Sequence, residues 1–475
     1  MEVIITSQHG ILISDIEKEL RSGTLLGRSV LITDSLPLSD RNIQADLLDV
    51  GELFALRSDP RILQVERLHE MAERTIPVPD AVQPINPIYQ DVLNNSHDNW
   101  GLDYCTEDTG STFTYSHTGK DVDVVIMDSG IHATHTEFMD MTNTFSRVQQ
   151  IEWKTGQNTD RPEHYTDTDG HGTHVAATVA GRTQGWAREA NIYAMKIFDS
   201  GAYGVLEALQ LIRNWHNTKM SNNPTVVNMS WGYSTDYPAN YPDAQLAGTP
   251  HPVRVASVDA ELESMIDDGI IIVSSAGNSD AYMPSPELPA YSEYYYTDAD
   301  YNYLPSITGA SYMYYYRRKT PAGANGVICV GSNGDISTLD KNARSSFSNY
   351  GERVDVFAPG SGIQSASISS DTALTKSSGT SMASPQVAGI AACLISMAPS
   401  ISLLTLNSII SSFGKQSVLT DMQGSTNLVA RLPFNGLRIK SNNEWKSFLP
   451  FYKDSTWKPV GFLHKANGQY KKIFR

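Results

Sequence analysis

The chain has 475 residues, of which 40% are hydrophobic and 19% are charged. This composition excludes a chain that is disordered throughout, and the length predicts a large body with one or two smaller units. Acidic residues outnumber basic ones by 52 to 36, so the net charge is −16. Most of the surface would repel a phosphate backbone, and we therefore expect no nucleic-acid partner.

Residues 1–80 predict a small α+β unit. Strand-like runs at Val3 to Thr6 and Ser29 to Thr33 flank a helix-like stretch from Ser14 to Arg21, in which Ser14 is the expected N-cap. The N-terminus lacks the basic start and apolar run of a signal peptide, and no stretch of about 18 apolar residues predicts a membrane span. We expect a protein that acts in the cytoplasm or leaves the cell without such a signal.

Residues 81–99 are predicted to be a proline-rich linker and processing region, because four prolines fall within the twelve residues from Ile76 to Pro87.

Residues 100–432 form the predicted body. Nearly unbroken apolar runs such as VDVVIM, TVVNMSW and GVICVGS alternate there with segments of helix length. A parallel sheet with helices on both faces requires this pattern, so the body is predicted to be α/β.

Two segments differ from the rest. Residues 280–321 hold 11 of the 23 tyrosines and are expected to form an ordered insertion. Residues 433–475 repeat an aromatic–Lys step at Trp445, Trp457 and Tyr470, each preceded by turn residues. This repeat predicts a small β module of short strands in a meander.

The three cysteines, Cys105, Cys329 and Cys393, are too few for a disulfide framework and show no zinc-ligand spacing. At most one disulfide could form. Each is expected to be a small buried residue.

Four segments carry the groups that a serine hydrolase needs: a hydroxyl, a base, a group that orients the base, and donors to the oxyanion. VVIMDSGI ends a strand at Asp128, and DGHGTHVAATVAG opens a helix with His171 in its first turn. IIIVSSAGN ends a strand at Asn278. SSGTSMASPQVAGIAACLI places Ser381 at the start of a long apolar helix, whose N-terminus favours negative charge.

Each segment alone has a commoner structural explanation as a turn, a cap or a structural histidine. Together and in this order, however, DSGI, HGTHVA, NMSWG, AGN and GTSMASP resemble the signature segments of the subtilisin family. SSFSNYG followed by VDVFAPG resembles the proteinase K-like branch of that family. The likeness runs from about Trp100 to Gly414.

The resemblance implies a subtilisin-like three-layer fold and a serine endopeptidase that forms an acyl-enzyme and needs no cofactor for its chemistry. By this likeness Asp128 orients His171, His171 acts as base and then acid, Ser381 attacks, and Asn278 donates to the oxyanion. His174 is expected to be structural. The alternative is a catalytically silent structural or adhesive component of a virus particle, which is disfavoured because all four groups are present.

The same likeness implies that a polypeptide substrate binds as an extended strand. Small residues are expected to leave the primary pocket open to apolar or aromatic side chains, and Trp231 to narrow the neighbouring subsites. The tyrosine-rich insertion begins beside this pocket and is expected to shape substrate access. The alternative is that it only binds a partner or stabilises the fold. The expected cleft residues are Gly201, Ala202, Tyr203, Ser230, Trp231, Gly232, Ser275, Ala276 and Gly277.

A structural calcium ion is a weaker expectation. Asp355 matches a calcium ligand of proteinase K-like enzymes, in which carbonyl groups near Asn325 and Val327 would complete an oxygen shell. A solvated surface aspartate is an equally good explanation.

The flanking units suggest regulation. The stretch ALRSDPRILQVERLHEM resembles the end of subtilisin-family propeptides, so residues 1–80 are expected to be an intramolecular inhibitor in a self-processing zymogen. Cleavage would fall in the linker or before Trp100. The alternative is a stable N-terminal domain that is never removed.

The C-terminal repeat resembles repeats at the ends of bacteriophage virion proteins. It predicts a virion-associated protein that is released by lysis and contacts other virion proteins. A basic tail that pairs with an acidic partner surface fits the charges equally well.

Overall fold

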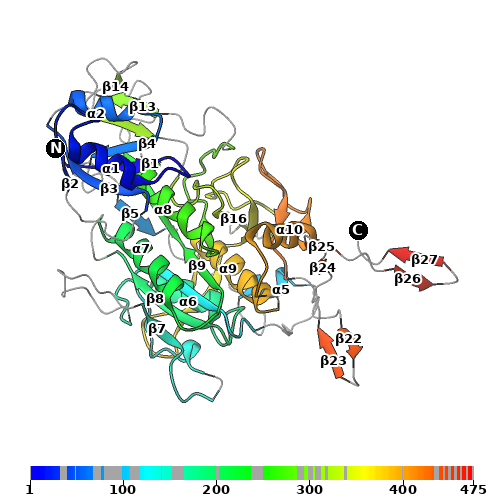
Figure 1. Ribbon diagram of the computed structural model, residues 1–475. Coiled ribbons are helices and arrows are strands. Elements are labelled where there is room, and N and C mark those ends of the chain that lie inside the picture. Colours follow the sequence, from blue (N-terminus) through cyan, green and yellow to red (C-terminus); the bar gives the residue numbers. More distant parts are fainter. Residues whose placement is uncertain are drawn as a thin grey trace.

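The computed structural model shows an N-terminal unit, a large body and a series of C-terminal hairpins (Figure 1). None of the helices among the described residues is both long and apolar enough to cross a membrane. The structure describes residues 2–32, 40–48, 50–67, 76–79, 99–106, 118–140, 142–151, 165–198, 203–236, 250–285, 294–297, 303–304, 312–315, 319–335, 340–397, 399–432, 438–441, 444–447, 451–453, 457–459, 463–466 and 469–472.

The body is built on a nine-stranded sheet with the order β20-β21-β17-β16-β12-β9-β6-β8-β7. Every neighbouring pair is parallel except β20 and β21, so the predicted α/β body with a mainly parallel sheet is confirmed. The central strands are buried along their whole length, as their unbroken apolar sequences require. The strands are β6 (Asp123–Asp128), β7 (Val148–Gln150), β8 (Asn191–Lys196), β9 (Thr225–Met229), β12 (Ile271–Ser275), β16 (Ile328–Asn333), β17 (Val356–Pro359), β20 (Lys415–Gln416) and β21 (Leu428–Val429).

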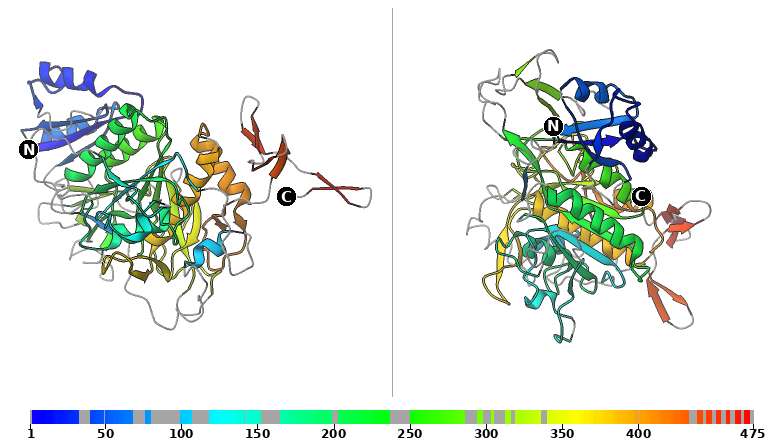
Figure 2. Two further views of the ribbon diagram at one scale, coloured as in Figure 1. Left: turned by 90° about the horizontal axis from the view of Figure 1, so that it is seen from below. Right: turned by 60° about the vertical axis from the view of Figure 1, so that its left-hand side comes forward.

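Helices cover both faces of this sheet and give three layers (Figures 1 and 2). Val124 and Ile126 of β6 share a core with α6 (His171–Ala180), α9 (Thr380–Met397) and α10 (Leu403–Phe413). Their neighbours Val125 and Met127 share a second core with α7 (Tyr203–Thr218) and α8 (Ala256–Asp267). Successive strand residues point to opposite faces, so the two cores lie on opposite sides of the sheet.

Shorter elements complete the body. They are α5 (Trp100–Tyr104), η1 (Thr136–Phe138), β10 (Trp231–Asp236), β11 (Pro250–Pro252), β18 (Ile363–Ala366) and β19 (Leu374–Ser377). Strand β10 runs between β11 and β5 (Ile76–Pro79) in a small antiparallel sheet.

The N-terminal unit is an antiparallel sheet of order β2-β3-β1-β4 with its own apolar core. Its helix α1 begins at Ile13 after an N-cap at Leu12, so the predicted cap at Ser14 is wrong and that residue lies in the first turn. The apolar Leu12 makes no capping bond with its side chain. The elements are β1 (Glu2–Ser7), α1 (Ile13–Ser22), β2 (Leu31–Ile32), β3 (Asn42–Asp46), α2 (Val50–Arg57) and β4 (Ile62–Arg67).

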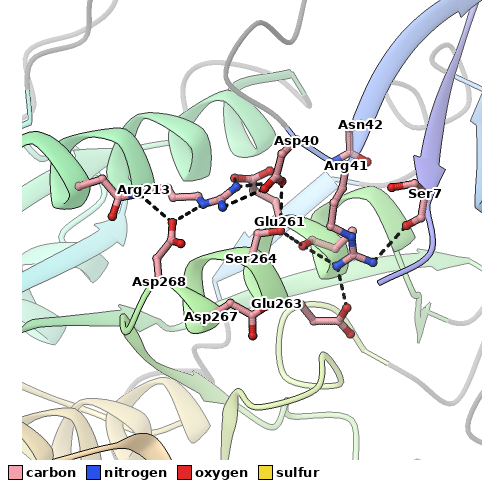
Figure 3. Close-up of polar contacts among 12 residues, drawn as sticks. Ser7, Asp40, Arg41, Asn42, Arg213, Glu261, Glu263, Ser264, Asp267 and Asp268 are labelled. Carbon is pink, nitrogen blue, oxygen red and sulfur yellow. Dashed lines mark hydrogen bonds and ion pairs between the residues drawn. The ribbon is translucent and has the colours of Figure 1, made fainter. Parts of the chain in front are cut away.

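Polar contacts join the N-terminal unit to α7 and α8 (Figure 3). Arg41 has a relative exposure of 6%, and its guanidinium donates to the Ala260 carbonyl at 3.1 Å and to the Glu263 carboxylate at 2.9 Å. On α7, the Arg213 guanidinium pairs with the Asp40 carboxylate at 3.0 and 3.1 Å. The unit therefore docks on these helices through charge pairs.

The tyrosine-rich insertion contains a three-stranded antiparallel sheet of order β14-β13-β15 among its described residues. These strands are β13 (Tyr294–Thr297), β14 (Tyr303–Leu304) and β15 (Tyr312–Tyr315). The other residues of 286–318 lie outside the described part of the chain.

Among the described residues, the predicted short strands of the C-terminal segment pair as three two-stranded ladders. Each aromatic residue of the repeat is directly opposite a lysine: Trp445 opposite Lys440, Trp457 opposite Lys453, and Tyr470 opposite Lys465. The strands are β22 (Arg438–Ser441), β23 (Glu444–Ser447), β24 (Phe451–Lys453), β25 (Trp457–Pro459), β26 (Leu463–Ala466) and β27 (Gln469–Lys472).

Candidate active site

The predicted functional residues gather where neighbouring parallel strands end. Asp128 is the last residue of β6, Ser230 follows β9, and Asn278 follows β12. These three strands are adjacent in the sheet, so the segments that leave their carboxyl ends meet at one edge. In open α/β sheets this edge is the usual position of a ligand site.

Asp128 and His171 form a buried pair. The His171 Nδ1 atom lies 2.7 Å from Asp128 Oδ1, and the side chains are 3% and 0% exposed. The Ser129 N–H also donates to Asp128 Oδ1 at 2.8 Å. Burial raises the pKa of Asp128 above the usual carboxyl value, while the charge and hydrogen bond of His171 oppose this rise. With Nδ1 bound to the carboxylate, Nε2 is the nitrogen that can accept a proton.

Asp167 fixes the start of the helix that carries His171. Gly170, the N-cap of α6, has a φ of 95° and no side chain to cap with. The Asp167 carboxylate instead accepts from the N–H groups of Gly170 and Thr173 at 2.8 and 2.9 Å, and from the Ser129 hydroxyl at 3.0 Å. Sequence reasoning missed this residue, although an aspartate just before a predicted helix is a recognised capping signal.

Ser381 is the second residue of α9, and its side chain is buried. Its hydroxyl donates to the Ser230 carbonyl at 2.9 Å, and the Ser230 hydroxyl donates back to the Ser381 carbonyl at 3.0 Å. These reciprocal bonds hold the N-terminus of α9 against the start of β10. The hydroxyl therefore lies beside the strand that is expected to bind substrate.

Thr380 holds the Asn278 side chain. Its backbone N–H and its hydroxyl both donate to Asn278 Oδ1, each at 2.9 Å. These bonds identify Oδ1 as the acceptor end of the amide, so Nδ2 is the donor end. The Thr380 hydroxyl also accepts from the Gly277 N–H at 3.0 Å. Sequence reasoning did not single out Thr380, although it lies within the quoted GTSMASP segment.

One wall of the expected cleft is already paired with another segment of the chain. Strand β5 lies antiparallel to β10, with Pro79 opposite Trp231, Val78 opposite Gly232, and Pro77 opposite Tyr233. The segment that was expected to bind an extended substrate therefore binds residues 76–79.

Trp231 does not narrow the subsites as predicted. Its indole is fully buried in the core between the sheet and α7 and α8, and Nε1 donates to the Met127 carbonyl at 2.8 Å. The ring also makes an edge-to-face contact with Tyr233, at 5.8 Å between centroids. The side chain thus anchors β10 to the end of β6, because a buried indole N–H needs an acceptor.

The primary pocket is not open as predicted, because Lys319 reaches between its two glycine walls. A Cβ atom built on Gly232 would overlap Lys319 Cε and lie 2.8 Å from Nζ. A Cβ atom built on Gly277 would also lie 2.8 Å from Nζ. Lys319 is 5% exposed. The small residues of both walls leave space that the lysine occupies.

The remaining cleft predictions have different outcomes. Ser275, the last residue of β12, and Ala276 are fully buried beside Gly277. Gly201 and Ala202 lie outside the described residues, and Tyr203 is the first residue of α7 rather than part of a strand.

The predicted calcium site does not fit a cation, because an arginine takes its place. The Arg353 guanidinium donates to Asp355 Oδ2 at 2.7 Å and to the carbonyls of Ala324 and Val327 at 2.9 and 2.8 Å. The Asn325 side chain donates to Glu263 at 2.8 Å. A positive group already satisfies the carboxylate and the Val327 carbonyl, so a calcium ion there would meet like charge.

The other singled-out residues are structural. His174 is buried, its Nε2 donates to the Ile363 carbonyl at 3.0 Å, and burial lowers its pKa to about 4. Cys105, Cys329 and Cys393 are buried free thiols. Within the described ranges, no group of three His, Cys, Asp or Glu side chains is placed to hold a metal ion.

Comparison with known proteins agrees with this geometry. A family model described as the Subtilase family matches residues 119–424. Subtilisin-like protease 2 of Pseudogymnoascus destructans is 33% identical over 340 residues, which cover 71% of this chain and 67% of the relative. Alkaline serine exoprotease A of Vibrio alginolyticus is 28% identical over 383 residues, covering 80% of this chain and 56% of that protein.

A solved structure described as a cold adapted subtilisin-like serine proteinase is also similar. It matches with a TM-score of 0.51 at 26% identity, over 71% of this chain and 98% of the other. The predicted subtilisin-like fold is thus confirmed. The chain belongs to the subtilase family and is a subtilisin-like serine endopeptidase.

Proposed function

We propose that the protein hydrolyses peptide bonds with Ser381 as nucleophile, His171 as general base and acid, and Asp128 as the group that orients the imidazole. The buried 2.7 Å contact between Asp128 and His171 is the observation that carries this proposal. It fixes the tautomer in which Nε2 accepts a proton, as a serine hydrolase requires.

We propose the following reaction, in which the Ser381 hydroxyl leaves the Ser230 carbonyl that it contacts in the structure and turns to His171. Ser381 Oγ attacks the substrate carbonyl and gives its proton to His171 Nε2, while Asp128 stabilises the imidazolium that forms. The Ser381 N–H and the Asn278 amide donate to the oxyanion, and Thr380 keeps that amide oriented. His171 then protonates the leaving amine. A water molecule completes hydrolysis of the acyl-enzyme by the same steps in reverse.

We also propose that the chain is made as a self-processing zymogen in which residues 1–80 act as the intramolecular inhibitor. Two observations support this. Strand β5 occupies the edge of β10 where an extended substrate would bind. The N-terminal unit, which precedes β5 in the chain, is docked on α7 and α8 by Arg41 and Arg213.

Intact-mass measurement tests both proposals. Wild-type protein is expected to lose its N-terminal unit, whereas Ser381→Ala is expected to remain full-length. Ser370→Ala changes an exposed serine and serves as the matched control, which should be processed like the wild type. A full-length wild type that still digests casein would refute the zymogen proposal alone. A Ser381→Ala variant that is processed and digests casein would refute the catalytic assignment.

A further inference from the structure

We propose that Asp167 is a positioning residue for the proposed reaction, which it serves in two ways. Through Ser129 and Thr173 it holds the start of α6 against the segment that follows β6. Its negative charge also favours the imidazolium that forms on His171 during the reaction. This inference rests on the proposed function, because Asp167 acts through the pair of Asp128 and His171.

The hydrogen bonds around Asp167 identify its side chain as an ionised carboxylate. The Gly172 N–H donates to the Ser129 hydroxyl at 2.9 Å, and the His132 N–H donates to the Thr173 hydroxyl at 2.9 Å. The Ser129 hydroxyl in turn donates to Asp167 Oδ1 at 3.0 Å, and the Thr173 hydroxyl donates to Oδ2 at 2.6 Å. A carboxylate accepts both hydroxyl protons, whereas a carboxylic acid would use one of its oxygens as a donor.

Two glycines bring the joined segments into backbone contact. A Cβ atom built on Gly172 would overlap the Gly130 carbonyl oxygen, and one built on Gly130 would overlap the Thr166 carbonyl oxygen. Gly130 also has a φ of 111°, which favours glycine. The segment after β6 thus lies directly on the segment that leads into α6, and Asp167 accepts hydrogen bonds from both.

The contact between Asp128 and His171 lies within this joint. Asp128 directly precedes Ser129, and His171 directly precedes Gly172. One hydrogen bond joins Ser129 to Gly172, and the next joins Asp128 to His171 at 2.7 Å. By accepting the Ser129 proton, Asp167 keeps the hydroxyl oxygen turned toward Gly172. Loss of that order would let the imidazole shift, and a misplacement of about 1 Å costs roughly 100-fold in rate.

The charge of Asp167 acts on the same pair through a buried setting. The Asp167 side chain belongs to a residue that is only 7% exposed, so water screens its charge weakly. Burial is the main cause that raises the pKa of Asp128, and the charge of Asp167 acts in the same direction. A negative charge at this place also attracts a proton on His171. Without it, the imidazole would take up its proton only at lower pH.

The other ionisable groups near His171 stay in place when Asp167 is changed. Strand β18 and the first three turns of α9, which also pack on α6, contain neither a charged side chain nor a histidine. Glu137 of η1 bonds beyond the far end of α6, at Thr183 and Gln184. The nearer groups are Asp128, Asp169, which accepts from the His171 N–H at 3.1 Å, His174 on the same helix, Lys196, which donates to the Thr166 carbonyl at 3.4 Å, and Asp371, which pairs with His132.

The pH dependence of peptide hydrolysis tests both effects of Asp167. The rate is measured from about pH 4 to about pH 9 with a quenched fluorescent peptide that contains a bond cleaved in casein, and a fluorophosphonate that labels Ser381 counts the active sites. Asp167→Asn should lower kcat roughly 10–100-fold, change KM less than about threefold, and move the acidic midpoint of kcat/KM down by about half a pH unit or more. Ser129→Ala keeps the charge, so it should lower kcat without moving the midpoint.

Matched variants separate charge from shape. Asp169→Asn removes the same charge at an exposed position, where water screens it, and should move the midpoint less than Asp167→Asn does. If Asp167→Asn yields no folded protein by circular dichroism, Asp167→Glu is compared with Asp167→Gln. Both lengthen the side chain equally, and only the glutamate keeps the charge, so equal midpoints in these two would overturn the inference.

The outcomes distinguish this inference from the proposed function. If the wild type hydrolyses neither casein nor the peptide, the proposed function fails. If the wild type is active and Asp167→Asn keeps the wild-type kcat or the wild-type midpoint, only the present inference fails. An unchanged kcat in Ser129→Ala overturns it as well, whether or not the Asp167 variants fold.

Discussion

Arg353 performs the role that a calcium ion was expected to perform, and its removal should destabilise the body. The guanidinium is 5% exposed and joins Asp355 to the carbonyls of Ala324 and Val327. Arg353→Ala leaves two buried carbonyl groups without these donors, at about 1–3 kcal/mol each. Asp355 is 48% exposed, so water screens its pairing, which is worth less than about 1 kcal/mol.

Together these terms predict a loss of about 2–7 kcal/mol in the free energy of unfolding. For a body of this size the loss corresponds to a decrease in Tm of roughly 3–10 °C. Differential scanning calorimetry measures it best in the Ser381→Ala background, where self-digestion cannot distort the transition. Lys120→Ala, at an exposed position, is the control and should change Tm little.

Added calcium provides a second test of the role of Arg353. With the arginine gone, the Asp355 carboxylate and the two carbonyls form an oxygen-rich site, so CaCl₂ should recover part of the lost Tm in Arg353→Ala. The reasoning is wrong if Arg353→Ala unfolds at the wild-type temperature. It is also wrong if calcium stabilises the wild type and Asp355→Asn abolishes that effect, because calcium would then displace the arginine.

Three further changes test other contacts. Thr380→Val removes one of two donors to Asn278 and should lower kcat about tenfold with little change in KM, measured with a peptide substrate; an unchanged kcat would contradict its positioning role. Burial lowers the pKa of His174 from 6.5 to about 4, so the unfolded chain binds more protons between these values and stability should fall as pH drops through them. His174→Gln should flatten this fall in urea titrations, and an identical slope would refute the assignment. Arg41→Met should reduce hydrogen-exchange protection in β1 and β3, because Glu263 loses its buried partner; unchanged protection would show that docking does not depend on this pair.

Those parts of the fold that local sequence patterns determine could be predicted from the sequence. The apolar runs of β6, β9, β12 and β16 predicted a covered parallel sheet, since only a strand buried on both faces tolerates such runs. Asp128 and His171 were also expected to meet, because the segments that carry them resemble the signature segments of the subtilisin family.

The contacts that were missed depend on long-range geometry. Lys319 and Arg353 are distant in sequence from the groups they approach, and nothing in the residues around them shows where a flexible basic side chain will point. Trp231 was assigned to the cleft from the resemblance alone, and the sequence does not show which face of β10 meets the core. The proteinase K-like branch, the virion association and the release by lysis remain predictions from sequence alone.

The surface of the N-terminal unit that contacts α8 carries polar side chains, unlike the unit's own apolar core. Val3 and Ile5 of β1 belong to the unit's own apolar cluster, while Asn42 and Arg41 make the bonds to α8. Detachment of the unit, which the proposed zymogen requires, would leave Val3 and Ile5 covered by the unit's own core. It would expose the polar groups of Arg41 and Asn42 together with the apolar Ile4, which is 3% exposed and belongs to the other face of β1.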